Sequence, residues 1–122
     1  MSRTERLTKL TRDLANGTPD IEAAAIVDLD GLMIASTLPA DVEDDSVAAM
    51  SAALLGISER ISDELKRGSF EMVMVRGSAG YVVIASAGDD AVLAVLTTTS
   101  AKLGLIFLDV KRASREITTL LG

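Results

Sequence analysis

The sequence contains no cysteine and no histidine, and aromatic residues make up only 2% of it. Without cysteine there is no disulfide framework. The two missing residue types are also the thiol nucleophile, the usual proton shuttle at neutral pH and the soft metal ligands. Most familiar catalytic designs are therefore excluded. We expect a protein that is not an enzyme and that holds no cofactor and no metal.

Long hydrophobic runs are also missing. The run from Ala91 to Leu96 is far shorter than the roughly 20 residues that cross a bilayer. Residues 1–14 alternate charged residues with leucines and do not form the apolar run of an export signal. The net charge of −6 should on balance repel nucleic acid and anionic membranes. We expect a cytoplasmic protein with no nucleic-acid partner and no direct membrane insertion.

The length of 122 residues suits one hydrophobic core, so we expect a single domain over residues 1–122. Apolar periodicity, turn residues and helix caps define the elements. Short turns between the last three strands predict an antiparallel meander. The expected elements are a helix from Ser2 to Asn16, strands over 23–27 and 32–36, a helix from the acidic segment 41–45 to about Arg67, strands over 70–76, 81–87 and 91–97, and a helix capped by Ser100.

The second predicted helix is apolar nearly all round. Its large side chains recur every three or four residues, and we predict that this stripe packs on the sheet. Small residues lie about a third of a turn away, which indicates contact with a second copy's helix. The alternative is that alanine is simply a good helix former at exposed positions. The stripe comprises Val47, Met50, Leu54, Ile57, Ile61 and Leu65, and the small residues include Ala49, Ala53 and Gly56.

The strand predicted over residues 70–76 is apolar on both faces. It is either an interior core strand or an edge strand that the same strand of a second copy extends. Together with the small residues of the second helix, this strand supplies the candidate dimer contacts. These are Ala49, Ala52, Ala53, Gly56, Arg60, Met72 and Met74.

Other patterns favour structural roles over chemistry. Asp28-x-Asp30-Gly31 resembles the start of a calcium loop, but Leu32 stands where a third oxygen ligand belongs, so we interpret it as a hairpin turn. The acidic segment 41–45 is better explained by helix capping than by a metal cluster. Ser58, Ser62 and Ser69 have no histidine as a base. We predict no catalytic, cofactor-binding or metal-binding residues.

The order αββαβββα and several stretches together resemble the Roadblock family of dynein light chains and small-GTPase regulators. The resemblance covers nearly the whole chain. It is carried by AAIVDLDGLMIAS at 24–36, the alanine-rich helix 48–60, MVRG at 74–77 running into GYVV at 80–83, and LGL at 103–105 with VKRA at 110–113.

This resemblance implies an α+β fold: a Roadblock/profilin-like sandwich in which a five-stranded antiparallel sheet carries one long helix on one face and the terminal helices on the other. Members of the family form homodimers or heterodimers in which the second helices pack together and the central strands join into one continuous sheet, and we expect a homodimer here. The implied partner is a Ras-like small GTPase, regulated without a catalytic residue from this chain, so neither Arg60 nor Arg76 is assigned as an arginine finger. The alternatives are a small-molecule sensor or a pure scaffold. Functions that depend on a tail after the last helix are not expected.

Overall fold

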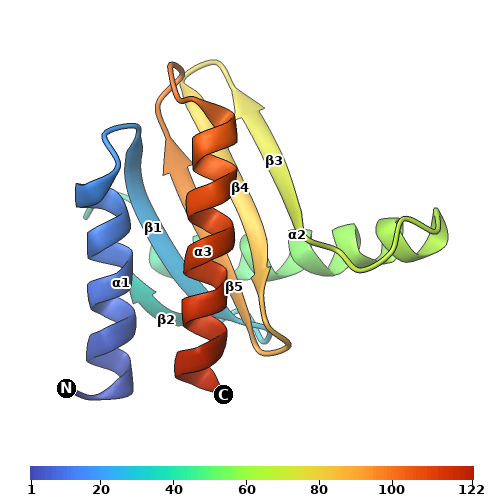
Figure 1. The fold of residues 1–122 in the computed structure, drawn as a ribbon, viewed down its shortest axis with the longest axis horizontal. Helices are drawn as coiled ribbons and strands as arrows, with labels where there is room; N and C mark the ends of the chain where they lie inside the picture. The colour runs from blue at the N-terminus through green and yellow to red at the C-terminus, as the bar shows by residue number, and fades with distance from the viewer.

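The computed structural model describes residues 1–122, and its elements follow the expected order αββαβββα (Figure 1). The long helix ends at Glu64, three residues before the predicted end, and Gly68 at φ +87° lies in the turn that follows. The elements are α1 Arg3–Gly17, β1 Ile21–Asp28, β2 Met33–Ser36, α2 Asp44–Glu64, β3 Met72–Gly77, β4 Gly80–Ala87, β5 Ala91–Thr97 and α3 Leu103–Leu121.

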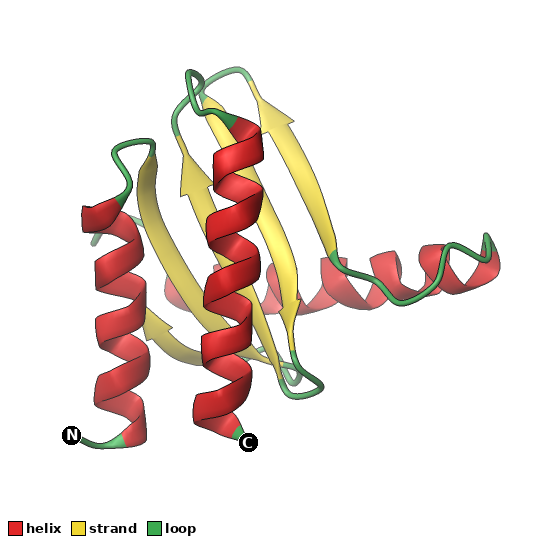
Figure 2. Cartoon of the chain, viewed as in Figure 1, coloured by secondary structure: helices red, strands yellow, loops and turns green.

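The five strands form one antiparallel sheet in the order β2-β1-β5-β4-β3 (Figure 2). β5 is the central strand, and its Ala94 pairs with Ala25 of β1 on one side and with Ile84 of β4 on the other. After β4 the chain turns back into β5, which lies between β4 and β1 and so joins the two hairpins into one sheet. β2 and β3 are therefore the two edge strands, and β3 is not interior.

Helices cover both faces of the sheet. α1 and α3 lie side by side and run in opposite directions on one face, and α2 crosses the other face (Figure 1). Side chains of successive strand residues point to opposite faces, so β1 and β5 supply both layers of the core. Ile26 and Leu93 pack toward α1 and α3, and Val27 and Val92 pack toward α2. The predicted fold class is confirmed.

The hairpin between β1 and β2 confirms the interpretation of Asp28 and Gly31 as turn residues. The Asp28 carboxylate accepts hydrogen bonds from the backbone N–H groups of Asp30 at 2.9 Å and Leu32 at 3.0 Å. Gly31 has a φ of +83°, which favours glycine. The carboxylate that resembled a calcium ligand therefore holds the turn.

The predicted cap of α3 is wrong, and the predicted acidic cap of α2 is confirmed in its charge but not in its hydrogen bonding. α3 begins at Leu103 with Lys102 as its N-cap, and the Ser100 hydroxyl lies 3.3 Å from that of Thr98. The N-cap of α2 is Glu43, whose side chain makes no capping hydrogen bond. The acidic segment acts through its charge, because Asp44 and Asp45 stand in the first turn, where the helix dipole favours negative charge.

Candidate functional site

The face of α2 that packs on the sheet is not the predicted one. Small side chains let the helix lie close to the strands, and only one large side chain, Leu55, is buried among them. The large apolar stripe is rotated by about a quarter turn from this buried face. The buried residues of α2 are Ala48, Ser51, Leu55 and Ser58, and exposed members of the stripe are Met50 at 64%, Ile57 at 57%, Ile61 at 53% and Leu65 at 63%. The prediction that the whole stripe packs on its own sheet is therefore wrong.

α2 is longer than the sheet that it covers. It contacts β1, β2, β4 and β5. Its C-terminal half continues past β3 and overhangs the edge of the sheet (Figure 1). The C-terminal half of α2 includes the exposed Ile57 and Ile61, and the exposed Leu65 is the C-cap that follows the helix. Three large apolar side chains therefore project from a helix arm that has no sheet beneath it within one copy of the chain.

The edge strand β3 is as poorly covered as the overhanging helix. Its only partner in the sheet is β4, so its outer edge is free. Residues 74–77 are all exposed, with Met74 at 37% and Val75 at 48%. A free edge with apolar side chains is a template for pairing with another strand.

An apolar hollow of about 410 Å³ lies beside β3 and is lined on the helix side by the N-terminal half of α2. It lies between α2 and the strands β3, β4 and β5. Ser51 is its one lining residue that is not hydrophobic, so the hollow has almost no hydrogen-bonding groups. The lining residues are Leu38, Val47, Met50, Ser51, Leu54, Val75, Val82, Ile84, Ala94 and Leu96.

The seven predicted dimer contacts do not form one patch. Met72 and Met74 pair with Ala85 and Val83, which face the α1/α3 layer, and so lie on the far side of the sheet from α2. The α2 residues all lie on or near its solvent side. Ala49, Ala53 and Arg60 are exposed, and Ala52 and Gly56 are half-buried.

Sequence reasoning missed the residues that make the uncovered surface continuous. The β3 residues on the same face of the sheet as α2 are Val73 and Val75. On α2 the missed residues are Met50, Ile57 and Ile61. Their signal was present as the apolar stripe, but a stripe that packs on its own sheet and one that packs on a partner have the same periodicity.

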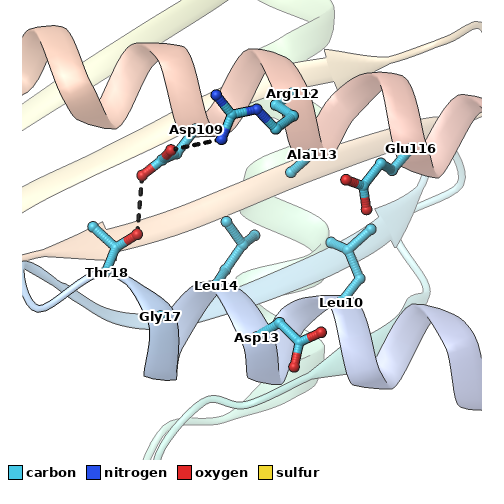
Figure 3. Close-up of a pocket in the computed structure, with 9 residues that line it drawn as sticks. All are labelled: Leu10, Asp13, Leu14, Gly17, Thr18, Asp109, Arg112, Ala113 and Glu116. Carbon is cyan, nitrogen blue, oxygen red and sulfur yellow. Dashed lines mark hydrogen bonds and ion pairs between the residues drawn. The ribbon is translucent and has the colours of Figure 1, made fainter.

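A groove between α1 and α3 is lined by a group of polar side chains (Figure 3). The Thr18 hydroxyl donates to Asp109 at 2.9 Å, and the Arg112 guanidinium lies 3.6 Å from the same carboxylate. Leu10 and Leu14 are also in its lining. Asp109 therefore joins the end of α1 to α3, and we interpret the polar contacts of this groove as packing contacts between the two helices.

The two arginines considered as possible arginine fingers, Arg60 and Arg76, lie on different faces of the sheet. Arg60 is exposed on α2. Arg76 follows Met72 and Met74 by alternation, so it lies on the α1/α3 side of the sheet, with its guanidinium 5.9 Å from the centre of the Tyr81 ring. The two arginines therefore lie on opposite faces of the sheet within one copy of the chain.

None of the helices combines the length and the apolar character that a membrane crossing requires. No group of three or more Asp or Glu side chains is placed to hold a metal ion.

Comparison with known proteins agrees with this architecture. Residues 7–97 match the Roadblock/LC7 domain family. The protein MJ1340 of Methanocaldococcus jannaschii is 39% identical over 102 residues, which cover 84% of this chain and 89% of that protein. MglB of Myxococcus xanthus has a similar structure, with a TM-score of 0.87, 20% identity and coverage of 95% of this chain and 94% of that one. A Schizosaccharomyces pombe profilin has a TM-score of 0.70 at 11% identity and covers 93% and 98%.

Proposed function

The chain belongs to the Roadblock/LC7 family, and from that premise we propose that it is a cytoplasmic, homodimeric interaction module that binds and regulates a Ras-like small GTPase. The observation that carries the proposal is the uncovered apolar surface formed by the overhanging arm of α2, the hollow and the free edge of β3. We call this surface the α2/β3 surface.

A twofold axis through the edge of β3 would satisfy every part of the α2/β3 surface at once. Antiparallel pairing of β3 with its copy extends the sheet to ten strands and leaves the α2 helices on one common face. Each overhanging arm then lies over the other copy's sheet. Ile57, Ile61 and Leu65 are the side chains available to cover the partner's hollow.

Two points support the GTPase assignment. The chain belongs to a family that includes small-GTPase regulators, and its uncovered surface is apolar, which suits contact with a protein and not chemistry. Phosphoryl transfer can use an arginine finger. Arg60 and Arg76 lie on opposite faces of the sheet, and the Arg76 guanidinium lies 5.9 Å from the centre of the Tyr81 ring. We propose that any increase in GTP hydrolysis comes from repositioning of the GTPase's own loops. The chain then acts without a catalytic residue of its own.

The proposal is tested by pull-down from native lysate with the tagged chain, in parallel with GDP and a non-hydrolysable GTP analogue. We expect a Ras-like GTPase to be enriched with the analogue. The recovered GTPase is then purified and its single-turnover hydrolysis measured with and without the dimer. Failure to recover any GTPase with either nucleotide contradicts the regulator function and leaves a scaffold role.

The second candidate function is a sensor of apolar small molecules, and the hollow of about 410 Å³ favours it. Ligand sites normally add a few convergent polar groups to an apolar lining, and this hollow offers only Ser51. A thermal-shift screen separates the two functions. Strong stabilisation by a metabolite that also dissociates the dimer would assign the hollow to a ligand.

A further inference from the structure

The charge of the molecule is unevenly divided between the two terminal helices and the rest of the chain. α1 and α3, counted with the N-cap Lys102, carry eight Lys or Arg and four Asp or Glu, a net charge of +4. The rest of the chain carries four Lys or Arg and fourteen Asp or Glu, a net charge of −10. The total of −6 therefore conceals a basic layer of two helices on an acidic body.

Most of the basic side chains in this layer are not neutralised by their neighbours. All eight are exposed. Lys9 pairs with Asp13, Arg112 with Asp109 and Lys111 with Glu71. The other five form no ion pair. They are Arg3, Arg6, Arg12, Lys102 and Arg115.

α3 also presents large apolar side chains to solvent. Ile106 and Val110 face the sheet, and residues about half a turn away point to solvent. These outward residues follow each other at helical spacing of three and four. Leu105 and Leu108, exposed by 57% and 52%, come first, and Arg112 and Arg115 follow them. The outer ridge of α3 is thus a pair of leucines next to a pair of arginines.

We propose that the outer surface of α1 and α3 is a peripheral docking surface for an anionic lipid bilayer. Its two helices lie side by side as one layer (Figure 1). Basic side chains beside apolar ones suit the interface of a bilayer, where cations meet anionic headgroups and leucines enter the acyl boundary. Phosphate backbones of nucleic acid would use the cations but leave Leu105 and Leu108 unsatisfied.

The acidic side of the molecule does not prevent this binding. The basic layer separates the bilayer from the sheet and α2, and one helix is about 10 Å thick. The Debye length is about 8 Å at physiological ionic strength. The bilayer therefore experiences the near layer of +4 much more strongly than the total of −6. Net charge alone led to the expectation that anionic membranes repel this chain.

The homodimer of the proposed function would double the surface, and this part of the inference rests on that function. Antiparallel pairing of two β3 strands keeps equivalent faces on the same side. Both α1/α3 layers then face one plane, and both α2 helices face away from it. The dimer would hold its bound partner on the side opposite the bilayer.

The test is co-flotation of the full chain with vesicles of phosphatidylcholine alone or phosphatidylcholine mixed with phosphatidylglycerol, at low and high salt. Arg112→Glu/Arg115→Glu is compared with Lys66→Glu/Arg67→Glu, which makes the same charge change at two exposed positions after the end of α2 and outside the candidate dimer contacts. We expect flotation only with the anionic vesicles, lost at high salt. Each cation near the bilayer contributes roughly fivefold to partitioning, so the α3 variant should lose at least about 25-fold and the control should not.

Light scattering on the same samples separates this inference from the dimer. Anionic vesicle binding by a monomeric chain supports the basic layer and contradicts only the doubling. The proposal is overturned if a folded dimer does not float with anionic vesicles. It is also overturned if the α3 variant floats as well as the unchanged chain, or if the chain floats equally with neutral vesicles. Salt-sensitive binding to polyglutamate without flotation would overturn it in favour of an acidic protein partner.

Discussion

At the scale of single residues, Gly80 is a position where the sheet requires glycine. It starts β4 directly after a two-residue turn, opposite Gly77, with a φ of +155° that side chains rarely adopt. A Cβ built on Gly80 would collide with the carbonyl oxygen of Thr97 in β5. The absence of a side chain at this position is what lets β4 begin so close to the end of β5.

We predict that Gly80→Ala lowers the free energy of unfolding by about 1–3 kcal/mol, because β4 has to move away from β5 and the backbone is strained. Urea denaturation followed by far-UV circular dichroism measures the change. The matched control is Gly104→Ala in α3, where an added Cβ meets nothing within 4 Å. Alanine favours a helix over glycine by about 1 kcal/mol, so the control should be neutral or stabilising. Equal losses in both variants would contradict the argument.

At the scale of single residues, local hydrogen bonding decided what the sequence could predict. Asp28 and Gly31 act within five residues of chain, and both were predicted correctly. Ser2 caps α1 with Glu5 in a reciprocal pair, again a local pattern. Ser100 was wrong because Thr98 and Asp20, 78 residues earlier, hold the start of this loop. Contacts of that separation leave no periodic signal.

At the scale of elements, the order and approximate bounds of all eight were predictable from periodicity and turns. The orientation of α2 was not. Both of its sides carry apolar residues. The side with the smaller residues packs on the sheet because Ala48, Ser51 and Ser58 allow a closer approach. The position of β3 at an edge was also left open, since its alternation is equally compatible with an interior strand.

The orientation of α2 gives the sharpest test of the dimer. We predict that Ile61→Glu raises the dimer dissociation constant about 100-fold or more, because an unpaired charge buried against the partner costs several kcal/mol. Ile61 is 53% exposed in one copy, so the protomer should stay folded. Sedimentation equilibrium measures the dissociation constant, and circular dichroism checks the fold.

The control for Ile61→Glu is Thr4→Glu, an exposed position on α1 in the opposite layer. It adds the same charge and should leave the dissociation constant unchanged. Ala53→Glu probes the small-residue side of α2. We expect weaker dimerisation there as well, because Ala53 lies next to Ile57 around the helix. A dimer unaffected by Ile61→Glu would place the interface elsewhere.

The edge strand β3 allows a test without any substitution. If β3 pairs with its copy, the outward backbone N–H groups of β3 are protected only in the dimer. We predict that amide exchange of residues 72–77 slows as protein concentration rises through the dissociation constant. β2, the other edge strand, is the internal control and should show no dependence on concentration. If the exchange rates of the β3 amides do not change with protein concentration, pairing of β3 with its copy is excluded.

At the scale of the whole molecule, charge and shape oppose each other. The α2/β3 surface is apolar and favours association, and each copy brings a net charge of −6 that opposes it. The basic layer of +4 stands on the far face of the sheet, so in the proposed dimer it meets no acidic side of the other copy. Electrostatics therefore opposes the proposed dimer and favours docking of the basic layer on an anionic bilayer.

This opposition predicts opposite responses to salt. Repulsion between two acidic copies extends over about 30 Å at 0.01 M ionic strength and about 10 Å at 0.1 M. Raising salt across this range should therefore lower the dimer dissociation constant, measured by sedimentation equilibrium, while it weakens flotation with anionic vesicles. Lys66→Glu/Arg67→Glu, at two exposed positions outside the candidate dimer contacts, makes each copy more acidic and should steepen the dimer's response. A dimer that dissociates as salt rises would mean that attractive charge pairs, and not the apolar α2/β3 surface, hold it together.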